Sequence, residues 1–240
     1  MILVVAGTGT GVGKTAVTAA VAAAHRGRTA VLKPAQTGAV PGEAGDADEV
    51  AHLVPGTAVC ELARYPDPLA PATAARRVGR AGVRAADAAD AARALAREND
   101  LVLVEGAGGL LVRLHAAGDT LADVAAELGA PVLLVVRAGL GTLNDTALAA
   151  EAVAARGLAC AGTVIGNLGV RPDLAVRCNL ADLPEVSGLP LLGALPEGAP
   201  ACRPRAFAEV AQAALAPPLG GRWRAPRRPG RVPVPEPVVR

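Results

Sequence analysis

The sequence of 240 residues lacks the marks of several protein classes. It has no run of about 18 apolar residues, and it opens on a strand-like stretch without a basic leader, so we expect a cytoplasmic protein that does not span a membrane. Its four cysteines form no Cys-x-x-Cys pair and have no histidine at metal-ligand spacing. This argues against a zinc site and a disulfide framework, and we expect the cysteines to be reduced and mostly packing residues.

Lysine is nearly absent. Only two of the 24 Lys and Arg residues are lysine, Lys14 and Lys33, and both lie near the beginning of the sequence. Codon usage can account for abundant arginine but not for the positions where lysine remains. Because lysine is a compact, mobile charge that can reach between phosphate oxygens, we expect both lysines to be functional.

Positive charge is concentrated at the end of the sequence. Residues 217–240 hold six arginines and one glutamate among many prolines and glycines, with no apolar periodicity. We therefore predict one folded domain over residues 1–216 and a disordered tail over residues 217–240. The rest of the chain is slightly acidic, so we expect neither nucleic acid nor a membrane as a partner.

Short runs rich in Val and Leu alternate with Ala-rich stretches of helical length. Runs that are apolar throughout are typical of parallel strands covered on both faces. The pattern predicts an α/β fold with a single doubly wound, mostly parallel sheet. The predicted strands are Ile2–Ala6, Thr29–Leu32, Leu101–Val104, Pro131–Val136, Ala161–Ile165 and Pro190–Ala194. Helix starts are predicted at Asp46, Asp87, Asp119-Thr120 and Asn144.

The segment GTGTGVGKT, from Gly7 to Thr15, follows the first predicted strand and is one residue longer than the usual Gly-x4-Gly-Lys-Ser/Thr loop. In such a loop, backbone N–H groups and the start of the next helix bind phosphates, Lys14 can reach the β and γ phosphates, and Thr15 can bind Mg²⁺. A dinucleotide fingerprint fails because Val12 and Lys14 stand where it needs glycine. The loop predicts a nucleoside triphosphate site.

Carboxylates follow two other predicted strands. Ligands of parallel sheets collect beyond the carboxyl ends of the strands, and Mg²⁺ bound to a triphosphate usually needs a carboxylate. Glu105 ends the run LVLVE and precedes GAGG, so it is the first candidate. Asp46 and Asp48 are second candidates, although Asp46 could equally be a helix N-cap. Thr37 could donate its hydroxyl to the same ligand or only stabilise a turn.

Together these segments resemble the dethiobiotin synthetase family of P-loop NTPases over about residues 2–216. The segments that carry the resemblance are GTGTGVGKT, KPAQTG, VEGAGGLLV, LGTLN, GN and LPEG. The resemblance implies an ATP-dependent, Mg²⁺-dependent ring closure in biotin biosynthesis, carried out by a homodimer. CO2 adds to one amine of 7,8-diaminononanoate, ATP phosphorylates the carbamate, and the second amine closes the ureido ring of dethiobiotin. The longer loop would leave room beside the γ-phosphate for this acceptor.

The resemblance also implies roles for individual residues. The implied catalytic residues are Lys33, Lys14 and Thr10, and the metal would be held by Thr15, Asp46 and Glu105. The implied nucleotide contacts are Gly11, Val12, Gly13, Lys14, Thr15, Ala16, Gly106, Ala107, Gly108, Asn167, Pro196, Glu197 and Gly198. Thr37 and Gly108 would contact substrate, and Asn144 would bind its carboxylate across the dimer interface. Because Asn167-Leu168 replaces an Asn-Asp pair found in some members, the base preference stays open.

A partitioning or septum-positioning ATPase is the alternative function on the same kind of sheet. Those switch proteins carry an additional lysine near the start of the loop, where this chain reads Gly7-Thr8-Gly9-Thr10. They also often end in a basic amphipathic helix, whereas residues 217–240 are interrupted too often by proline to form one. The sequence therefore favours the synthetase.

Overall fold

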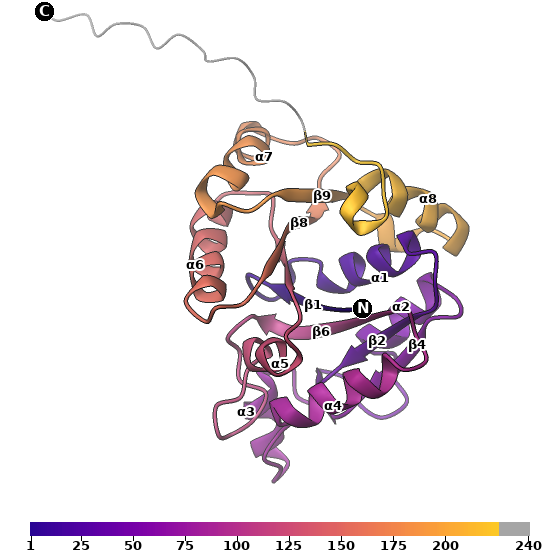
Figure 1. Ribbon diagram of the computed structural model, residues 1–240, viewed down its shortest axis with the longest axis vertical. Coiled ribbons are helices and arrows are strands. Elements are labelled where there is room, and N and C mark those ends of the chain that lie inside the picture. Colours follow the sequence, from indigo (N-terminus) through magenta and orange to yellow (C-terminus); the bar gives the residue numbers. More distant parts are fainter. Residues whose placement is uncertain (226–240) are drawn as a thin grey trace, which may run out of the picture.

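A seven-stranded parallel sheet forms the centre of the molecule (Figure 1). The computed structural model describes residues 1–225, so residues 226–240 of the predicted tail lie outside the described residues. The sheet order is β4-β2-β6-β1-β7-β8-β9, which contains all six predicted strands and one further strand, β4. Their bounds are β1 (Ile2–Gly7), β2 (Thr29–Lys33), β4 (Ala58–Glu61), β6 (Leu101–Gly109), β7 (Val132–Val136), β8 (Cys160–Leu168) and β9 (Leu191–Pro196).

Helices cover both faces of this sheet, as predicted. Successive strand residues point to opposite faces, so Val4 packs in one apolar cluster and Val5 in the other. The cluster of Val4 includes residues from α3 (Pro71–Arg77), α4 (Ala85–Leu95), α5 (Leu121–Leu128), α6 (Thr142–Ala154) and α7 (Leu174–Ser187). The cluster of Val5 includes residues from α1 (Lys14–Ala24), α2 (Asp46–Leu53) and α8 (Pro204–Ala214).

Three short strands were not predicted. Strand β4 lies at the edge of the sheet, where Ala58 and Val59 are exposed, so it lacks the buried apolar run that marks the other strands. Strands β3 (Gln36–Thr37) and β5 (Arg64–Tyr65) form a separate two-stranded sheet. Two residues are too few to show periodicity in a sequence.

Two helices begin earlier than predicted. Helix α4 starts at Ala85 rather than after Asp87, and α6 starts at Thr142, so that Asn144 is its third residue. The N–H of Ala85 donates to Oδ2 of Asp119 at 2.8 Å, although the two residues lie 34 positions apart. A cap supplied by a distant side chain cannot be read from local sequence.

The folded part of the chain extends beyond the predicted boundary at residue 216. Residues 217–219 form the 3₁₀ helix η2 (Pro217–Leu219), in which Leu219 is buried. Trp223 donates its backbone N–H to the carbonyl of Leu215 at 2.8 Å and packs against both apolar clusters. The sequence missed this because one tryptophan in a Pro- and Arg-rich segment shows no periodicity.

In the described part of the chain, no helix combines the length and the apolar character that crossing a membrane requires. All four cysteines are free thiols. Cys60, Cys160 and Cys202 are partly buried, whereas Cys178 is exposed, so three of the four cysteines are placed where they can pack.

Candidate active site

The carboxyl ends of β1, β2 and β6 meet at a cleft of about 770 Å³. Because all three strands are parallel, the loops that follow them lie at the same edge of the sheet. The cleft is also bounded by the start of α2 and by the segment before α3. Among the residues predicted for the site, those that line the cleft are Thr10, Gly11, Gly13, Lys14, Thr15, Ala16, Lys33, Thr37, Asp46, Ala107 and Gly108.

The glycine-rich loop lies against the end of β8. Gly13 caps α1 in the left-handed conformation with φ of 93°, and a Cβ added to it would lie 2.7 Å from the carbonyl oxygen of Gly166. Both the backbone angle and this close approach require glycine. Helix α1 begins at the next residue, so its free N–H groups are placed at the cleft, as an anion site needs. Val12 is buried, so only its backbone is suited to a phosphate contact.

Lys14 is buried within this loop and has one hydrogen-bond acceptor. Its Nζ donates to the carbonyl oxygen of Gly9 at 2.9 Å. Burial, and next the neighbouring charge of Lys33, lower the pKa of Lys14 below its ordinary value. An anionic ligand in the cleft would relieve both effects, because it would offset the cost of the buried charge.

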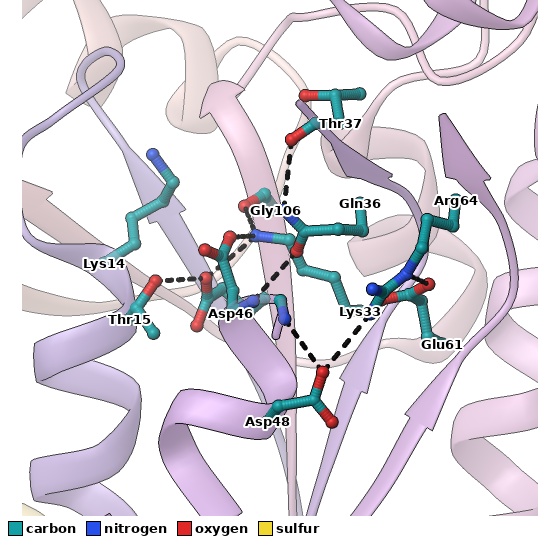
Figure 2. Close-up of polar contacts among 12 residues, drawn as sticks. Lys14, Thr15, Lys33, Gln36, Thr37, Asp46, Asp48, Glu61, Arg64 and Gly106 are labelled. Carbon is teal, nitrogen blue, oxygen red and sulfur yellow. Dashed lines mark hydrogen bonds and ion pairs between the residues drawn. The ribbon is translucent and has the colours of Figure 1, made fainter. Parts of the chain in front are cut away.

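Lys33 lies at the end of β2, between two carboxylates. Leu32 pairs with Val104, so Lys33 comes beside Glu105 on the neighbouring strand. Its Nζ donates to Oε1 of Glu105 at 2.9 Å and to the carbonyl of Gly106 at 3.0 Å, and it also pairs with the carboxylate of Asp46 (Figure 2). Only 2% of the Lys33 side chain is exposed.

The two carboxylates decide the charge state of Lys33. Burial alone would lower the pKa of this ammonium, but the nearby charges of Glu105 and Asp46 outweigh burial and raise the pKa above its ordinary value. Lys33 is therefore a fixed positive charge at neutral pH. The two lysines of the cleft thus lie in opposite electrostatic surroundings.

The oxygens around Glu105 fit a magnesium ion. Oε1 of Glu105 also accepts from the hydroxyl of Thr15 at 2.9 Å, whereas Oε2 is buried and has no hydrogen-bond partner among the described residues. An unsatisfied buried carboxylate oxygen is uncommon, and carboxylate and hydroxyl oxygens are ligands that Mg²⁺ accepts. Residues 1–225 contain no group of three His, Cys, Asp or Glu side chains that could hold a metal alone. An ion here would complete its shell with oxygens of the nucleotide.

Asp46 and Asp48 differ in role although they lie two residues apart. Gly45 is the N-cap of α2, and Oδ2 of Asp48 accepts from the N–H of Gly45 at 2.8 Å. This bond and the nearby Arg64 lower the pKa of Asp48. Asp46 is the first helical residue, and its carboxylate points to Lys33 (Figure 2). The interpretation of Asp46 as the helix N-cap is therefore wrong: Gly45 is the N-cap, and Asp48, at the third helical position, binds its N–H.

Another group of predicted residues lies at the carboxyl ends of β8 and β9, outside the 770 Å³ cleft. Asn167 is next to Leu168, which pairs with Pro196, and the N–H of Glu197 donates to the carbonyl of Leu168 at 2.8 Å. These residues adjoin the glycine-rich loop through Gly166, which lies against Gly13. Asn144 is exposed on α6 and also lies outside the cleft. We call Asn144, Asn167 and residues 196–198 the rim; within residues 1–225, its side chains make no hydrogen bonds.

The cleft contains residues that the sequence did not single out. They are Gln36, Glu49, residues 68–71, Val112 and Pro200. Glu49 lies one helical turn after Asp46, a spacing that could have revealed it. Burial, followed by the charges of Asp46 and Glu105, raises the pKa of Glu49. Residues 68–71 carry no signal in the sequence, because their place in the cleft depends on how the whole chain folds.

Comparison with known sequences identifies close relatives. Residues 2–205 match a family described as an AAA domain. The chain is 65% identical to the ATP-dependent dethiobiotin synthetase BioD of Saccharopolyspora erythraea, covering 92% of this chain and 98% of the relative. It is 64% identical to the protein of the same name from Streptomyces coelicolor, covering 93% and 95%. It is 60% identical to the protein of that name from Streptomyces avermitilis, and the match again covers 93% of this chain and 95% of the relative.

Solved structures with the same fold are more distant in sequence. A ParA family ATPase from Chlorobium tepidum superposes with a TM-score of 0.54 at 14% identity, covering 87% of this chain and 90% of that one. The cell division ATPase MinD of Pyrococcus furiosus superposes with a TM-score of 0.52 at 19% identity, covering 88% of this chain and 96% of that one. At such identities the likeness extends to the fold alone.

Proposed function

The chain belongs to the ATP-dependent dethiobiotin synthetase family, and we propose that its cleft holds ATP at the phosphate loop with 7,8-diaminononanoate beside Lys33 and Thr37. It is an ATP-dependent ligase that makes dethiobiotin in biotin biosynthesis. The observation that carries the assignment of the site is the buried, charged Lys33 at the end of β2, within reach of the phosphate loop. We also propose that the protein acts in the cytoplasm, where ATP is available as co-substrate.

The reaction needs CO2 as the source of the ureido carbon. One amine of the diamine attacks CO2 and loses a proton, which gives a carbamate. A carbamate oxygen attacks the γ-phosphorus of ATP and expels ADP, which leaves a carbamic-phosphoric anhydride. The second amine attacks the carbonyl of this anhydride and expels phosphate, so the ureido ring closes.

Electrostatic stabilisation is the main task of the protein in such a transfer. The N–H groups of residues 11–16 bind phosphate oxygens at the start of α1. Lys14 exchanges its bond with Gly9 for β and γ oxygens, and Thr10 lies at the same end of the cleft. Lys33 neutralises charge on the carbamate and on the phosphoryl group during transfer. Thr37 and the backbone of Gly108 position the diamine.

Magnesium fits this arrangement through Thr15, Asp46 and Glu105. When bound, it supplies positive charge to the β and γ phosphate oxygens. Oε2 of Glu105, which has no partner among residues 1–225, is the oxygen best suited to contribute. Asn167 and residues 196–198 contact the nucleobase, since they adjoin the loop at Gly166.

A homodimer completes the site through the rim. Next to Asn144, the side chains of Leu140 and Leu148 are 88% and 59% exposed, and Leu148 borders a groove of about 330 Å³ beside α6. Exposed leucines beside a groove support an interaction site on this side of α6. Asn144 and the first N–H groups of α6 then bind the carboxylate of the substrate held by the other protomer.

Product formation tests this assignment. The protein is incubated with diaminononanoate, ¹³C-bicarbonate, Mg²⁺ and ATP, and dethiobiotin is detected by mass. We expect one labelled carbon per product and one ADP per dethiobiotin, with no product when nucleotide is left out. ADP release that neither needs the diamine nor yields dethiobiotin would contradict the proposal and favour a switch ATPase.

A further inference from the structure

Gln36 lies in the cleft between Thr37 and the start of α2. It belongs to β3, directly before Thr37, and it lines the cleft beside Asp46. Only 7% of Gln36 is exposed. A buried amide has to find hydrogen-bond partners on both its oxygen and its nitrogen, so the contacts of Gln36 reveal what it holds in place.

Both ends of the Gln36 amide contact backbone at the site. Its Oε1 accepts from the N–H of Asp46 at 3.0 Å, and its Nε2 donates to the carbonyl of Thr37 at 3.1 Å (Figure 2). The first N–H groups of a helix have no acceptor within the helix, and Asp46 is the first residue of α2. Gln36 therefore supplies the acceptor that the helix lacks at this residue.

Gly45 allows the side chain of Gln36 to come this close. A Cβ added at Gly45 would lie 3.0 Å from Oε1 of Gln36 and 2.9 Å from Nη2 of Arg64. Arg64 in turn bonds both carboxylate oxygens of Glu61, at 2.7 and 2.9 Å, and lies 3.3 Å from Asp48. The start of α2 is thus held from the cleft side by Gln36 and from the outer side by Arg64.

The helix does not need Gln36 in order to begin. Gly45 is the N-cap of α2, and Asp48 already binds the N–H of Gly45. What Gln36 adds is a bond to the residue whose carboxylate pairs with Lys33. We propose that Gln36 is a positioning residue: it sets the carboxylate of Asp46 against Lys33 and holds Thr37 of β3 beside them. The part of this inference that concerns Mg²⁺ and the diamine rests on the proposed function.

Amide hydrogen exchange, resolved by residue with NMR, tests the contact in the protein without nucleotide or metal. In Gln36→Met, which removes both polar atoms but keeps the side-chain length, the N–H of Asp46 should exchange about five- to tenfold faster. The N–H of Gly45 should stay within about twofold, because its acceptor on Asp48 is untouched. An unchanged exchange rate at Asp46, or an equal rise at both residues, would overturn the proposal.

Kinetics test the consequence for the site. Gln36→Met should raise the half-saturating Mg²⁺ concentration and the KM for diaminononanoate, each about fivefold, with a smaller change in kcat. In an Asp46→Asn background it should add no further change in Mg²⁺ dependence, since Gln36 acts on Mg²⁺ through Asp46. Full additivity in that background would contradict the proposal.

Two further variants serve as matched controls. Gln36→Glu keeps an acceptor for Asp46 but loses the donor to Thr37, so it should keep the slow exchange at Asp46 and still raise the KM for the diamine. Gln212→Met removes an exposed glutamine of α8 that bonds only Arg222, and it should change neither measurement. A wild-type enzyme that turns over without Mg²⁺ would contradict the proposed metal site. The exchange rate at Asp46 tests the bond between Gln36 and Asp46 independently of any metal.

Discussion

Two groups of residues lie at the same edge of the sheet: the centre, which we define as Thr15, Lys33, Asp46 and Glu105, and the rim. They differ in how their side chains are held. In the centre, Lys33, Glu105 and Thr15 are linked through a single carboxylate oxygen, and Asp46 completes the group. The rim, formed by Asn144, Asn167 and residues 196–198, has no side-chain hydrogen bonds within residues 1–225 and is exposed.

This difference follows from the sheet. Strands β1, β2 and β6 are neighbours, so one chain assembles the centre from residues far apart in sequence. The rim follows β7, β8 and β9 towards the other edge, where its polar groups are left to solvent or to a ligand. A preorganised centre is what phosphoryl transfer requires, and an open rim is suited to recognising the ends of ligands.

Removing the central cation should have the largest effect. Lys33→Met should lower kcat by about 10²- to 10³-fold, the usual consequence of losing one preorganised electrostatic group. It also leaves Glu105 buried without its cation, which costs about 3–5 kcal/mol of unfolding free energy. Single-turnover assays and chemical denaturation measure these two quantities. A variant that keeps a kcat within about twofold of wild type would contradict the role of Lys33.

Lys14→Ala should damage nucleotide binding as well as turnover. Loss of one charge-assisted hydrogen bond lowers affinity about 10- to 100-fold, whereas Lys33→Met should bind a non-hydrolysable nucleotide about as well as wild type. Titration calorimetry on both variants separates the two lysines. Equal losses of affinity would show that Lys33 binds nucleotide in the ground state.

The acidic pair of α2 offers a matched comparison within the centre. Asp46→Asn should raise the Mg²⁺ concentration for half activity about tenfold, because a metal carboxylate is lost. Asp48→Asn should change it less than twofold, since the amide oxygen of asparagine can still accept from the N–H of Gly45. Mg²⁺ titrations of both variants provide the test. A silent Asp46→Asn would leave Glu105 as the sole acidic candidate for the metal.

Base selectivity at the rim should be the smallest effect. An exposed amide that forms a single hydrogen bond contributes about 1 kcal/mol, so kcat/KM for ATP should exceed that for GTP or CTP by no more than about tenfold. Asn167→Ala should reduce that ratio further. Assays with the three nucleotides measure this ratio of kcat/KM values. A strong preference for ATP that remains in Asn167→Ala would show that Asn167 does not recognise the base.

The sequence predicted the centre better than the details around it. Uninterrupted apolar runs predict parallel strands, and a glycine loop that ends in one of only two lysines predicts a phosphate site. These patterns placed Lys14, Lys33 and Glu105 at one edge of the sheet, where the structure has them, and their roles stay predictions. The choice between Asp46 and Asp48 could not be made, because it depends on the backbone of Gly45 and the reach of Arg64. Segment 68–71 was missed for a similar reason, since only the folded chain brings it to the cleft.

The rim residues came from family resemblance rather than from their own pattern. Nothing in the spacing around Asn144 or Asn167 points to a ligand, and the structure leaves both exposed at the surface. Their proposed roles need something beyond one chain: a nucleotide for Asn167 and a second protomer for Asn144.

Mixing two defective chains tests most directly whether the centre of one chain works with the rim of another. If Asn144 serves the partner's substrate, a mixed dimer of Lys33→Met and Asn144→Ala has one site with both defects and one with neither. At random assortment about half of the dimers are mixed, so about a quarter of the wild-type activity should return. No recovery, with subunit exchange shown independently, would contradict the account and assign Asn144 to its own chain or to no ligand.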